Sequence, residues 1–243
     1  MSLERLDKLL SDTGQFTRSK ARVLIKSGLV LVDGAPVRSP EAKISRDSRI
    51  TAQGRDIDAS EYVYWMLHKP AGYISASKDE LYPAVTRLMP EEARKRGVFC
   101  VGRLDADVTG LLILTDDGAY AHRVTAPRAE IEKTYEVYLD TPIAADDVEA
   151  LSRGVVWSDG TEYRPAVLVS DGRDKRRGLV TVTEGKFHEV KRLMAFCGHE
   201  ILSMRRLSIG ALRLDETLSE GQSKRLTPEQ AMLVFHKNNE VNP

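Results

Sequence analysis

The feature that most constrains the fold is a helix–helix–hairpin pattern at the start of the chain. Leucines at helical spacing indicate a first short helix, and they are Leu6, Leu9 and Leu10. A second helix is predicted over Arg18–Ser27, where Thr17 can serve as the N-cap and Gly28 ends the helix. The apolar stretch Leu29–Val32 then predicts a strand, and Asp33-Gly34 predicts the hairpin turn that follows it. These elements are expected to fold as a small unit of their own.

Basic side chains are concentrated in the same region. Arg18, Arg22 and Lys26 recur every four residues beside the apolar stripe of the second predicted helix. Residues 1–55 contain 11 Lys and Arg against 6 Asp and Glu, whereas the whole chain contains 36 of each. This asymmetry indicates a local contact with a polyanion rather than indiscriminate binding of nucleic acid. The alternative is a basic surface that is only hydrated.

This region resembles the S4 RNA-binding domain, a family first named from a ribosomal protein. Three elements stand at the family's spacing: Arg-x-x-Ala beginning at Arg18, Ile-x-x-Gly at Ile25 and Val-Asp-Gly at Val32. The resemblance implies a two-helix unit followed by a hairpin, in which Arg18, Arg22 and Lys26 contact RNA phosphates. A small basic cap without a ligand is the remaining alternative.

A polar stretch separates this region from the rest of the chain. Residues Ala52–Glu61, which Gly54 interrupts, are interpreted as a linker. We therefore expect an S4-like domain over residues 1–58 and a second domain over residues 59–243. Strands interleave irregularly with few helices in the second domain, so the fold class is α+β with a mixed, largely antiparallel sheet.

Apolar stretches and alternation predict the elements of the second domain. Strands are expected at Tyr62–Leu67, Tyr73–Ser75, Leu111–Thr115, Lys133–Leu139, Ala166–Val169 and Gly178–Thr183. Helices are expected at His188–Phe196 and at Pro228–His236, the latter opened by a capping box at Thr227 and Gln230. The terminal Asn238–Pro243 is expected to be frayed.

The segment with the clearest chemical content is Gly102–Leu112, a polar loop that runs straight into a buried strand. Such a mounting holds a reactive side chain accurately in place. The segment resembles the motif Gly-Arg-Leu-Asp-x-x-Thr-x-Gly-Leu-Leu of pseudouridine synthases of the RsuA type, with Val108 as a minor departure. This resemblance implies that Asp105 is the catalytic carboxylate and that Arg103 holds the RNA open around a flipped uridine. From the residues alone, a capped turn between strands is also possible.

Two further segments resemble motifs of the same family. Glu132–Tyr135 resembles the second motif, which implies that Tyr135 packs against the target base. Glu184–Leu193 resembles the third, in which Lys191 takes the place of the basic partner of the catalytic aspartate. Arg192 lies nearly opposite the apolar stripe of the predicted helix, which suits an outward contact with phosphate.

Three other positions are interpreted differently. The segment His68–Tyr73 resembles the family's opening motif and is interpreted as mainly structural. Glu189 stands where relatives usually have Gln, so no RNA contact is assigned to it. Asp107 shares the loop of Asp105 and is interpreted as a turn residue.

The implied reaction requires no cofactor and no metal, because uridine and pseudouridine are isomers. One carboxylate can attack C1′ of the ribose as a nucleophile or remove a proton from C2′, and both routes remain open. A cation such as Lys191 would keep that carboxylate ionised and oriented. Cys100 and Cys197 lack the spacing of a metal site or a disulfide framework and are predicted to be reduced core thiols.

The sequence also bears on location and partners. The longest apolar runs are strand-sized and no signal-peptide core is present, so a cytoplasmic protein without a membrane partner is expected. The resemblance implies a monomer. The Phe187-His188 form of the third motif resembles enzymes that act on 16S rRNA, which indicates 16S rRNA or an assembling small subunit and a site of the uridine 516 type. A 23S rRNA synthase of the same family and a non-catalytic S4-domain RNA-binding protein are the alternatives.

Overall fold

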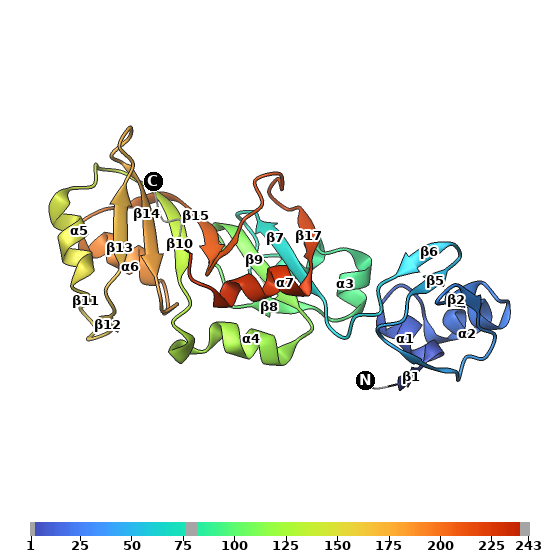
Figure 1. Ribbon diagram of the computed structural model, residues 1–243. Coiled ribbons are helices and arrows are strands. Elements are labelled where there is room, and N and C mark those ends of the chain that lie inside the picture. Colours follow the sequence, from blue (N-terminus) through green and yellow to red (C-terminus); the bar gives the residue numbers. More distant parts are fainter. Residues whose placement is uncertain (1–2, 76–81, 239–243) are drawn as a thin grey trace. The chain divides into compact units, whose positions relative to one another are not determined.

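The computed structural model describes residues 3–75 and 82–238, and it divides into two compact units (Figure 1). The first unit comprises residues 1–63 and 89–98, and the second comprises residues 64–88 and 99–243. The return of residues 89–98 to the first unit has no counterpart in the sequence-based division after residue 58.

The first unit combines helices with two small sheets. The helices are α1 (Leu6–Asp12), α2 (Arg18–Lys26) and α3 (Glu91–Lys95). The larger sheet has the order β3-β2-β5-β6, with β2 (Val30–Val32), β3 (Ala35–Pro36), β5 (Ile50–Ala52) and β6 (Arg55–Ile57). The smaller sheet pairs β1 (Leu3–Arg5) with β4 (Lys43–Ser45). The two predicted helices and the predicted hairpin are thus confirmed.

Local signals explain where these elements begin and turn. The side-chain oxygen of Thr17 accepts a hydrogen bond from the backbone N–H of Lys20, which caps α2 as predicted. Asp33 and Gly34 have φ angles of 50° and 84°, so both occupy the left-handed region that a tight hairpin turn requires. The buried core includes Leu6, Leu9, Leu10, Ala21, Leu24, Ile25, Val30, Ile50 and Ile57.

The predicted linker at Ala52–Glu61 is wrong in its first half. Strands β5 and β6 form a hairpin there, and Gly54 lies in its turn with a φ of 76°. Ile50 and Ile57 face the core, whereas the polar side chains between them point outward. Only one face of an edge hairpin is buried, so its sequence is polar enough to resemble a linker.

The second unit is built on a nine-stranded mixed sheet. Its main path has the order β13-β14-β10-β15-β9-β7-β17, with β16 paired to β15 and β8 paired to β9. The strands are β7 (Tyr64–Lys69), β8 (Phe99–Val101), β9 (Thr109–Thr115), β10 (Lys133–Leu139), β13 (Val167–Ser170), β14 (Arg177–Val182), β15 (Ile201–Ile209), β16 (Leu212–Arg213) and β17 (Ser223–Leu226). Among the described strands of this sheet, only β9 and β15 pair in parallel. The predicted α+β class is confirmed.

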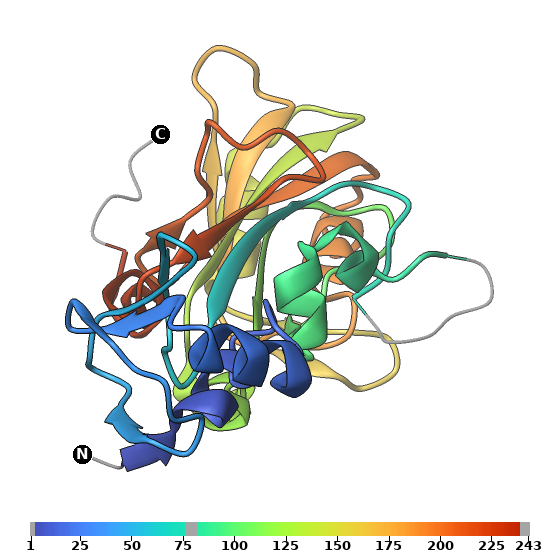
Figure 2. The same cartoon turned by 90° about the vertical axis from the view of Figure 1, so that its right-hand side faces the viewer.

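Helices cover the middle of this sheet. Helix α4 (Gly118–Thr125), helix α7 (Pro228–Met232) and the 3-10 turn Leu233–Phe235 pack on β7 and β9. Their shared core includes Tyr64, Met66, Leu111, Ile113, Tyr120, Val124, Ala231 and Val234. Figure 2 shows the red strand β17 beside the cyan strand β7, so both ends of this unit's sequence meet in one sheet.

The remaining elements of the second unit are short. They are the helices α5 (Ala145–Ser152) and α6 (Glu189–Phe196), the hairpin β11 (Val155–Val156) and β12 (Glu162–Tyr163), and the 3-10 turns Val85–Leu88 and Pro127–Ala129. The predicted capping box of α7 is present, because Thr227 and Gln230 exchange hydrogen bonds. The predicted fraying of Asn238–Pro243 falls mostly on residues 239–243, which lie outside the described residues.

Candidate active site

Asp105 lies in the loop between β8 and β9, and this loop is fixed at both ends. Near its start, the hydroxyl of Ser75 donates to the carbonyl of Leu104 (3.2 Å) and accepts from the N–H of Leu104 (3.1 Å). At its end, Gly110 has a φ of 106° and lies against β15, where a Cβ atom would come within 2.3 Å of the carbonyl oxygen of Arg206. Glycine is therefore required where the loop joins the sheet.

Lys69 holds the middle of the same loop from below. Its side chain is fully buried, and its ammonium donates hydrogen bonds to the carbonyls of Pro70 (3.0 Å), Ala106 (3.2 Å) and Val108 (2.7 Å). Burial lowers the pKa of Lys69 to about 8. The interpretation of the segment around Lys69 as mainly structural does not include this contact with the Asp105 loop. The available signal was a lysine at the end of an apolar strand, which must find backbone partners if it is buried.

Two carboxylates and two basic side chains meet above the loop. The ammonium of Lys191 lies 3.3 Å from Oδ2 of Asp105 and 2.8 Å from both oxygens of Asp107. Nε2 of His188 lies 3.4 Å from the same Oδ2 of Asp105. Lys191 comes from α6, and His188 directly precedes that helix with a φ of 51°. The structure therefore brings Lys191 to Asp105, as the sequence resemblance implied.

Asp107 is more than a turn residue. Burial opposes its charge, but the hydrogen bond and the charge of Lys191 outweigh burial and lower the pKa of Asp107. Burial likewise opposes the charge of Lys191, and Asp107 and Asp105 together raise the pKa of Lys191. The interpretation of Asp107 as a plain turn residue needs this correction, because Asp107 is the nearer partner of the lysine. Spacing along the chain does not show which loop carboxylate a distant lysine will reach.

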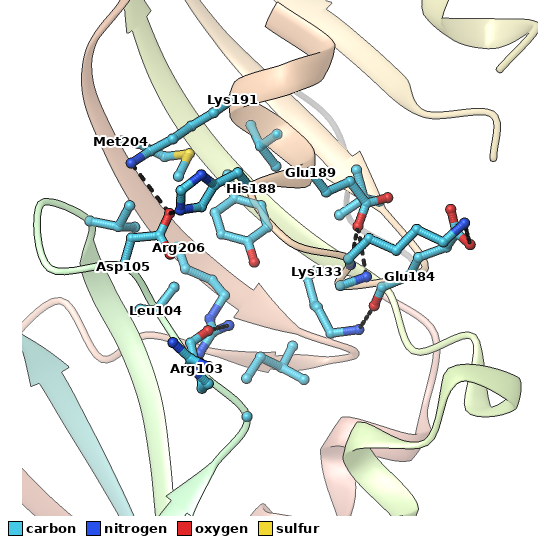
Figure 3. Close-up of a pocket in the computed structure, with 18 of the residues that line it drawn as sticks. Arg103, Leu104, Asp105, Lys133, Glu184, His188, Glu189, Lys191, Met204 and Arg206 are labelled. Carbon is cyan, nitrogen blue, oxygen red and sulfur yellow. Dashed lines mark hydrogen bonds and ion pairs between the residues drawn. The ribbon is translucent and has the colours of Figure 1, made fainter. Parts of the chain in front are cut away.

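A cavity of about 160 Å³ opens beside Asp105 (Figure 3). Its lining comes from the loop, the start of β10, the end of β14, α6 and β15. Tyr135 on β10 lines this cavity and is buried, with its ring centroid 6.0 Å from the guanidinium carbon of Arg206. Asp105, Tyr135 and Lys191 therefore lie around one cavity.

Two other carboxylates line the cavity, but both already have backbone partners. Glu189 accepts hydrogen bonds from the N–H groups of Gly185 (2.7 Å) and Lys186 (3.1 Å), and burial raises the pKa of Glu189. Glu184 accepts from the N–H of Arg164 (2.9 Å) and pairs with the ammonium of Lys186 (2.9 Å). Both side chains are held by backbone N–H groups, whereas the contacts of the Asp105 carboxylate among the described residues are the side chains of Lys191 and His188.

The two arginines assigned to RNA on the second unit differ in their surroundings. Arg103 is exposed and lines the mouth of the cavity beside Asp105. Arg192 is partly buried, because its guanidinium donates to Asp159 (3.0 Å) and to the hydroxyl of Tyr163 (3.0 Å). Arg192 therefore has protein partners at the position where a phosphate contact was expected.

The basic stripe of the first unit is organised around a buried carboxylate. Nε of Arg22 lies 2.9 Å and Nε of Arg18 lies 3.5 Å from Oδ2 of Asp7, whose side chain is fully buried. Arg5 donates to the same carboxylate, and hydrogen bonds from Arg5 and Arg22 hold the pKa of Asp7 far below its usual range despite the opposing effect of burial. Lys26 is exposed and has no side-chain partner among the described residues. Arg18 and Arg22 remain about half exposed.

Several expectations concern groups that could hold other chemistry. Among residues 3–75 and 82–238, no cluster of three or more His, Cys, Asp or Glu side chains could bind a metal ion. Within the same ranges, no helix has the length and apolar character needed to cross a membrane. Cys100 and Cys197 are free, and burial raises the pKa of each thiol to about 11, although both are only partly buried rather than in the core.

Two known protein families match this chain. The family model of RNA pseudouridylate synthases matches residues 63–196, and the S4 domain matches residues 4–50. The chain belongs to the RNA pseudouridylate synthase family. This synthase is therefore an isomerase that carries an S4 RNA-binding domain, as predicted, and the non-catalytic alternative is wrong.

Individual relatives extend over almost the whole synthase. Ribosomal small subunit pseudouridine synthase A of Vibrio cholerae is 39% identical over 232 residues, which cover 95% of this chain and 99% of that protein. An RNA pseudouridine synthase of Bacillus subtilis is 36% identical over 233 residues, covering 95% and 98%. A crystal structure of a pseudouridylate synthase matches with a TM-score of 0.66 at 33% identity and covers 95% of this chain and 99% of that one.

Proposed function

We propose that this synthase converts one uridine of 16S rRNA, at a site of the uridine 516 type, to pseudouridine, with Asp105 as the carboxylate that acts on the ribose. The observation that carries the assignment is the position of Asp105. It lines the cavity beside Tyr135 and faces the ammonium of Lys191 and the imidazole of His188, whereas the other lining carboxylates accept hydrogen bonds from backbone N–H groups. The relatives named for the ribosomal small subunit support the choice of RNA.

The arrangement suits a reaction in which base and ribose separate and rejoin. The bond between N1 and C1′ breaks while Asp105 either bonds to C1′ or takes a proton from C2′. The base then rejoins C1′ through C5, while the bond from Asp105 to C1′ breaks or Asp105 returns the proton to C2′. C5 then loses its proton, and N1 gains one. Lys191 fixes the direction of the carboxylate, and the buried ring of Tyr135 packs against the base. A base must leave its helix to reach such a cavity, and in this proposal Arg103, an exposed lining residue, holds the RNA open.

The S4 domain supplies a second RNA contact in this proposal. Arg18, Arg22 and Lys26 present half-exposed or exposed cations on one helix, which suits contacts with successive phosphates. Arg192 adds a further phosphate contact if RNA displaces Asp159. The synthase then acts as a monomer in the cytoplasm, on 16S rRNA or an assembling small subunit.

The decisive test of the site is Asp105→Asn, which nearly preserves volume but removes the negative charge. Loss of a general base typically costs a factor of ~10²–10⁴, and loss of the only group that acts on the ribose should cost more. We expect release of tritium from RNA labelled at C5 of uridine to vanish, with unchanged folding and RNA affinity. Asp107→Asn should slow release only several-fold, because Lys191 keeps Asp105 as a partner. Asp174→Asn, on an exposed loop, should have no effect. An inactive Asp107 variant beside an active Asp105 variant would show that the wrong carboxylate was chosen.

The choice of RNA has its own test. Pseudouridines are mapped in rRNA from cells with and without the gene, and purified synthase is offered 16S and 23S RNA separately. We expect one pseudouridine to disappear from 16S rRNA and tritium to be released from 16S RNA alone. Release only from 23S RNA would overturn the small-subunit assignment while leaving the reaction intact.

A further inference from the structure

Besides the exposed Arg103, two cations on strands of the sheet line the cavity without any carboxylate partner among the described residues. Arg206 on β15 is 3% exposed, and Lys133 at the start of β10 is partly buried. Nε of Arg206 donates to the carbonyl of Leu111 (2.8 Å) and Nη1 to that of Arg103 (3.5 Å). Lys133 donates to two carbonyls, those of Ile131 and Glu184. Neither side chain takes part in the ion-pair cluster around Asp105.

Both cations keep N–H groups that the protein does not use. Nη2 of Arg206 is buried and has no hydrogen-bond partner among residues 3–75 and 82–238. A guanidinium carries five N–H donors and an ammonium three, so Arg206 retains at least the two on Nη2 and Lys133 retains one. A buried donor without a partner costs free energy, and such groups in a folded protein call for an explanation. A bound group that accepts hydrogen bonds would satisfy them.

Both side chains line the same cavity as Tyr135, and neither pairs with Asp105. Arg206 and Tyr135 are paired across β15 and β10, which fixes the guanidinium beside the aromatic ring. Lys133 and Lys191 reach the cavity from opposite sides (Figure 3). Burial lowers the pKa of Lys133 to about 8, in keeping with an ammonium that has only carbonyl partners.

The chemistry of the reaction names the missing acceptor. When the bond from N1 to C1′ breaks, its electron pair stays on N1, and the detached uracil is an anion whose charge spreads to its two carbonyl oxygens. This holds whether Asp105 attacks C1′ or removes the proton from C2′. An anion in a buried cavity needs donors that are already in position before it forms.

We propose that Arg206, with Lys133 as a second donor, binds the carbonyl oxygens of the detached uracil and stabilises it as an anion until C5 rejoins C1′. This inference rests on the proposed function, in which Asp105 acts on the ribose. The roles of the cations then differ: Lys191 pairs with the carboxylate of Asp105, whereas Arg206 and Lys133 donate hydrogen bonds to the detached uracil. Loss of one such preorganised donor typically lowers the turnover rate by ~10²–10³.

The test compares uridine with 5-fluorouridine at the target position of the RNA. Fluorine withdraws electron density, so the 5-fluorouracil anion is more stable and depends less on Arg206. Single-turnover rates are measured as loss of the starting nucleoside after nuclease digestion, alongside RNA affinity. We expect Arg206→Gln to lower the rate by ~10²–10³ on uridine RNA. The deficit on 5-fluorouridine RNA should be at least about tenfold smaller, with unchanged affinity on both, and Lys133→Met should show the same pattern more weakly.

Three controls keep this outcome readable. Lys191 acts through Asp105, so Lys191→Met should lower the single-turnover rate by the same factor on both RNAs. If a different step limited the rate on 5-fluorouridine RNA, the Lys191→Met deficit would shrink there as well, and this control would reveal it. Arg205→Gln removes the neighbouring arginine of β15, which pairs with Glu136, and should not change the rate. Arg206→Lys keeps the charge and should retain more activity than Arg206→Gln, which guards against a simple loss of folding. An Arg206→Gln deficit equal on both RNAs would overturn the proposal and leave Arg206 a support of the loop. Activity in Asp105→Asn would instead overturn the proposed function.

Discussion

The two units of the synthase hold their cations in opposite ways. In the first unit, Arg18 and Arg22 surround the buried carboxylate of Asp7 and stay about half exposed. In the second unit, Lys69 and Arg206 are buried, and their partners are backbone carbonyls. Three of these carbonyls lie in the loop that carries Asp105, and the others belong to Pro70 and Leu111. A half-exposed arginine can turn part of its fork to a phosphate, whereas a buried lysine cannot leave without releasing the loop. The first arrangement suits reversible binding, and the second suits fixed geometry.

The largest effect that would sharpen this comparison is expected from Lys69→Met. The substitution keeps an apolar stem but leaves three carbonyls without their donor, and an unsatisfied buried group costs ~1–3 kcal/mol. Relief from burying a charge offsets part of this, so we expect unfolding free energy to fall by about 2–4 kcal/mol. A loop displaced by about 1 Å costs roughly 10²-fold in rate. Chemical denaturation and tritium release measure the two effects.

The matched control is Arg49→Met in the first unit, where an exposed arginine pairs with Asp56 at 3.1 Å. Exposed pairs contribute about 0–1 kcal/mol, so stability and rate should barely change. If Lys69→Met were as mild as Arg49→Met, the distinction between cations that fix geometry and cations at the surface would fail.

Some residues in this contrast could be predicted from the sequence, and others could not. The alternation of Lys133–Leu139 predicted β10 with its observed ends, and Thr17 predicted the start of α2, because both signals are local. The resemblance to the family's third motif implied that Lys191 lies beside Asp105. Sequence reasoning missed Asp7 as the anchor of the arginines and Arg206 as a cavity cation. Each depends on which face a polar residue occupies after distant elements pack, and no local pattern contains that information.

An intermediate effect is expected when Arg18, Arg22 and Lys26 are all changed to Ala. If each side chain contacts one phosphate, the slope of log affinity against log salt should fall by roughly two to three units. The turnover rate at saturating RNA should stay the same, because these residues act only in binding. Equilibrium titrations at several salt concentrations measure the slope. Arg153→Ala, an exposed residue at the end of α5, is the control and should leave the slope unchanged. An unchanged slope in the triple variant would mean that this stripe contacts no RNA phosphate.

The smallest expected effect is on the pH dependence of the unfolding free energy. It distinguishes the two units because the change falls in a different pH range for each. Burial lowers the pKa of Lys69 to about 8 in the folded state, whereas an unfolded lysine titrates near ~10.4. Between these values the unfolded chain binds more protons, so stability conferred by this residue rises with pH across that window. The pKa of Asp7 is also below its unfolded value of ~3.9, so stability conferred by Asp7 is present above that value and is lost as the pH falls below it. Thermal unfolding across pH should therefore show a gap between the wild type and Asp7→Asn that narrows only in acid. The gap between the wild type and Lys69→Met should widen only above about pH 8, and a shift of roughly 2–4 °C per kcal/mol is measurable for a chain of this size. If the difference in stability between the wild type and Lys69→Met stays constant up to pH 10, the three carbonyls keep this lysine charged. Burial of its ammonium would then carry no free-energy cost, and Lys69 would not differ in this respect from the arginines around Asp7.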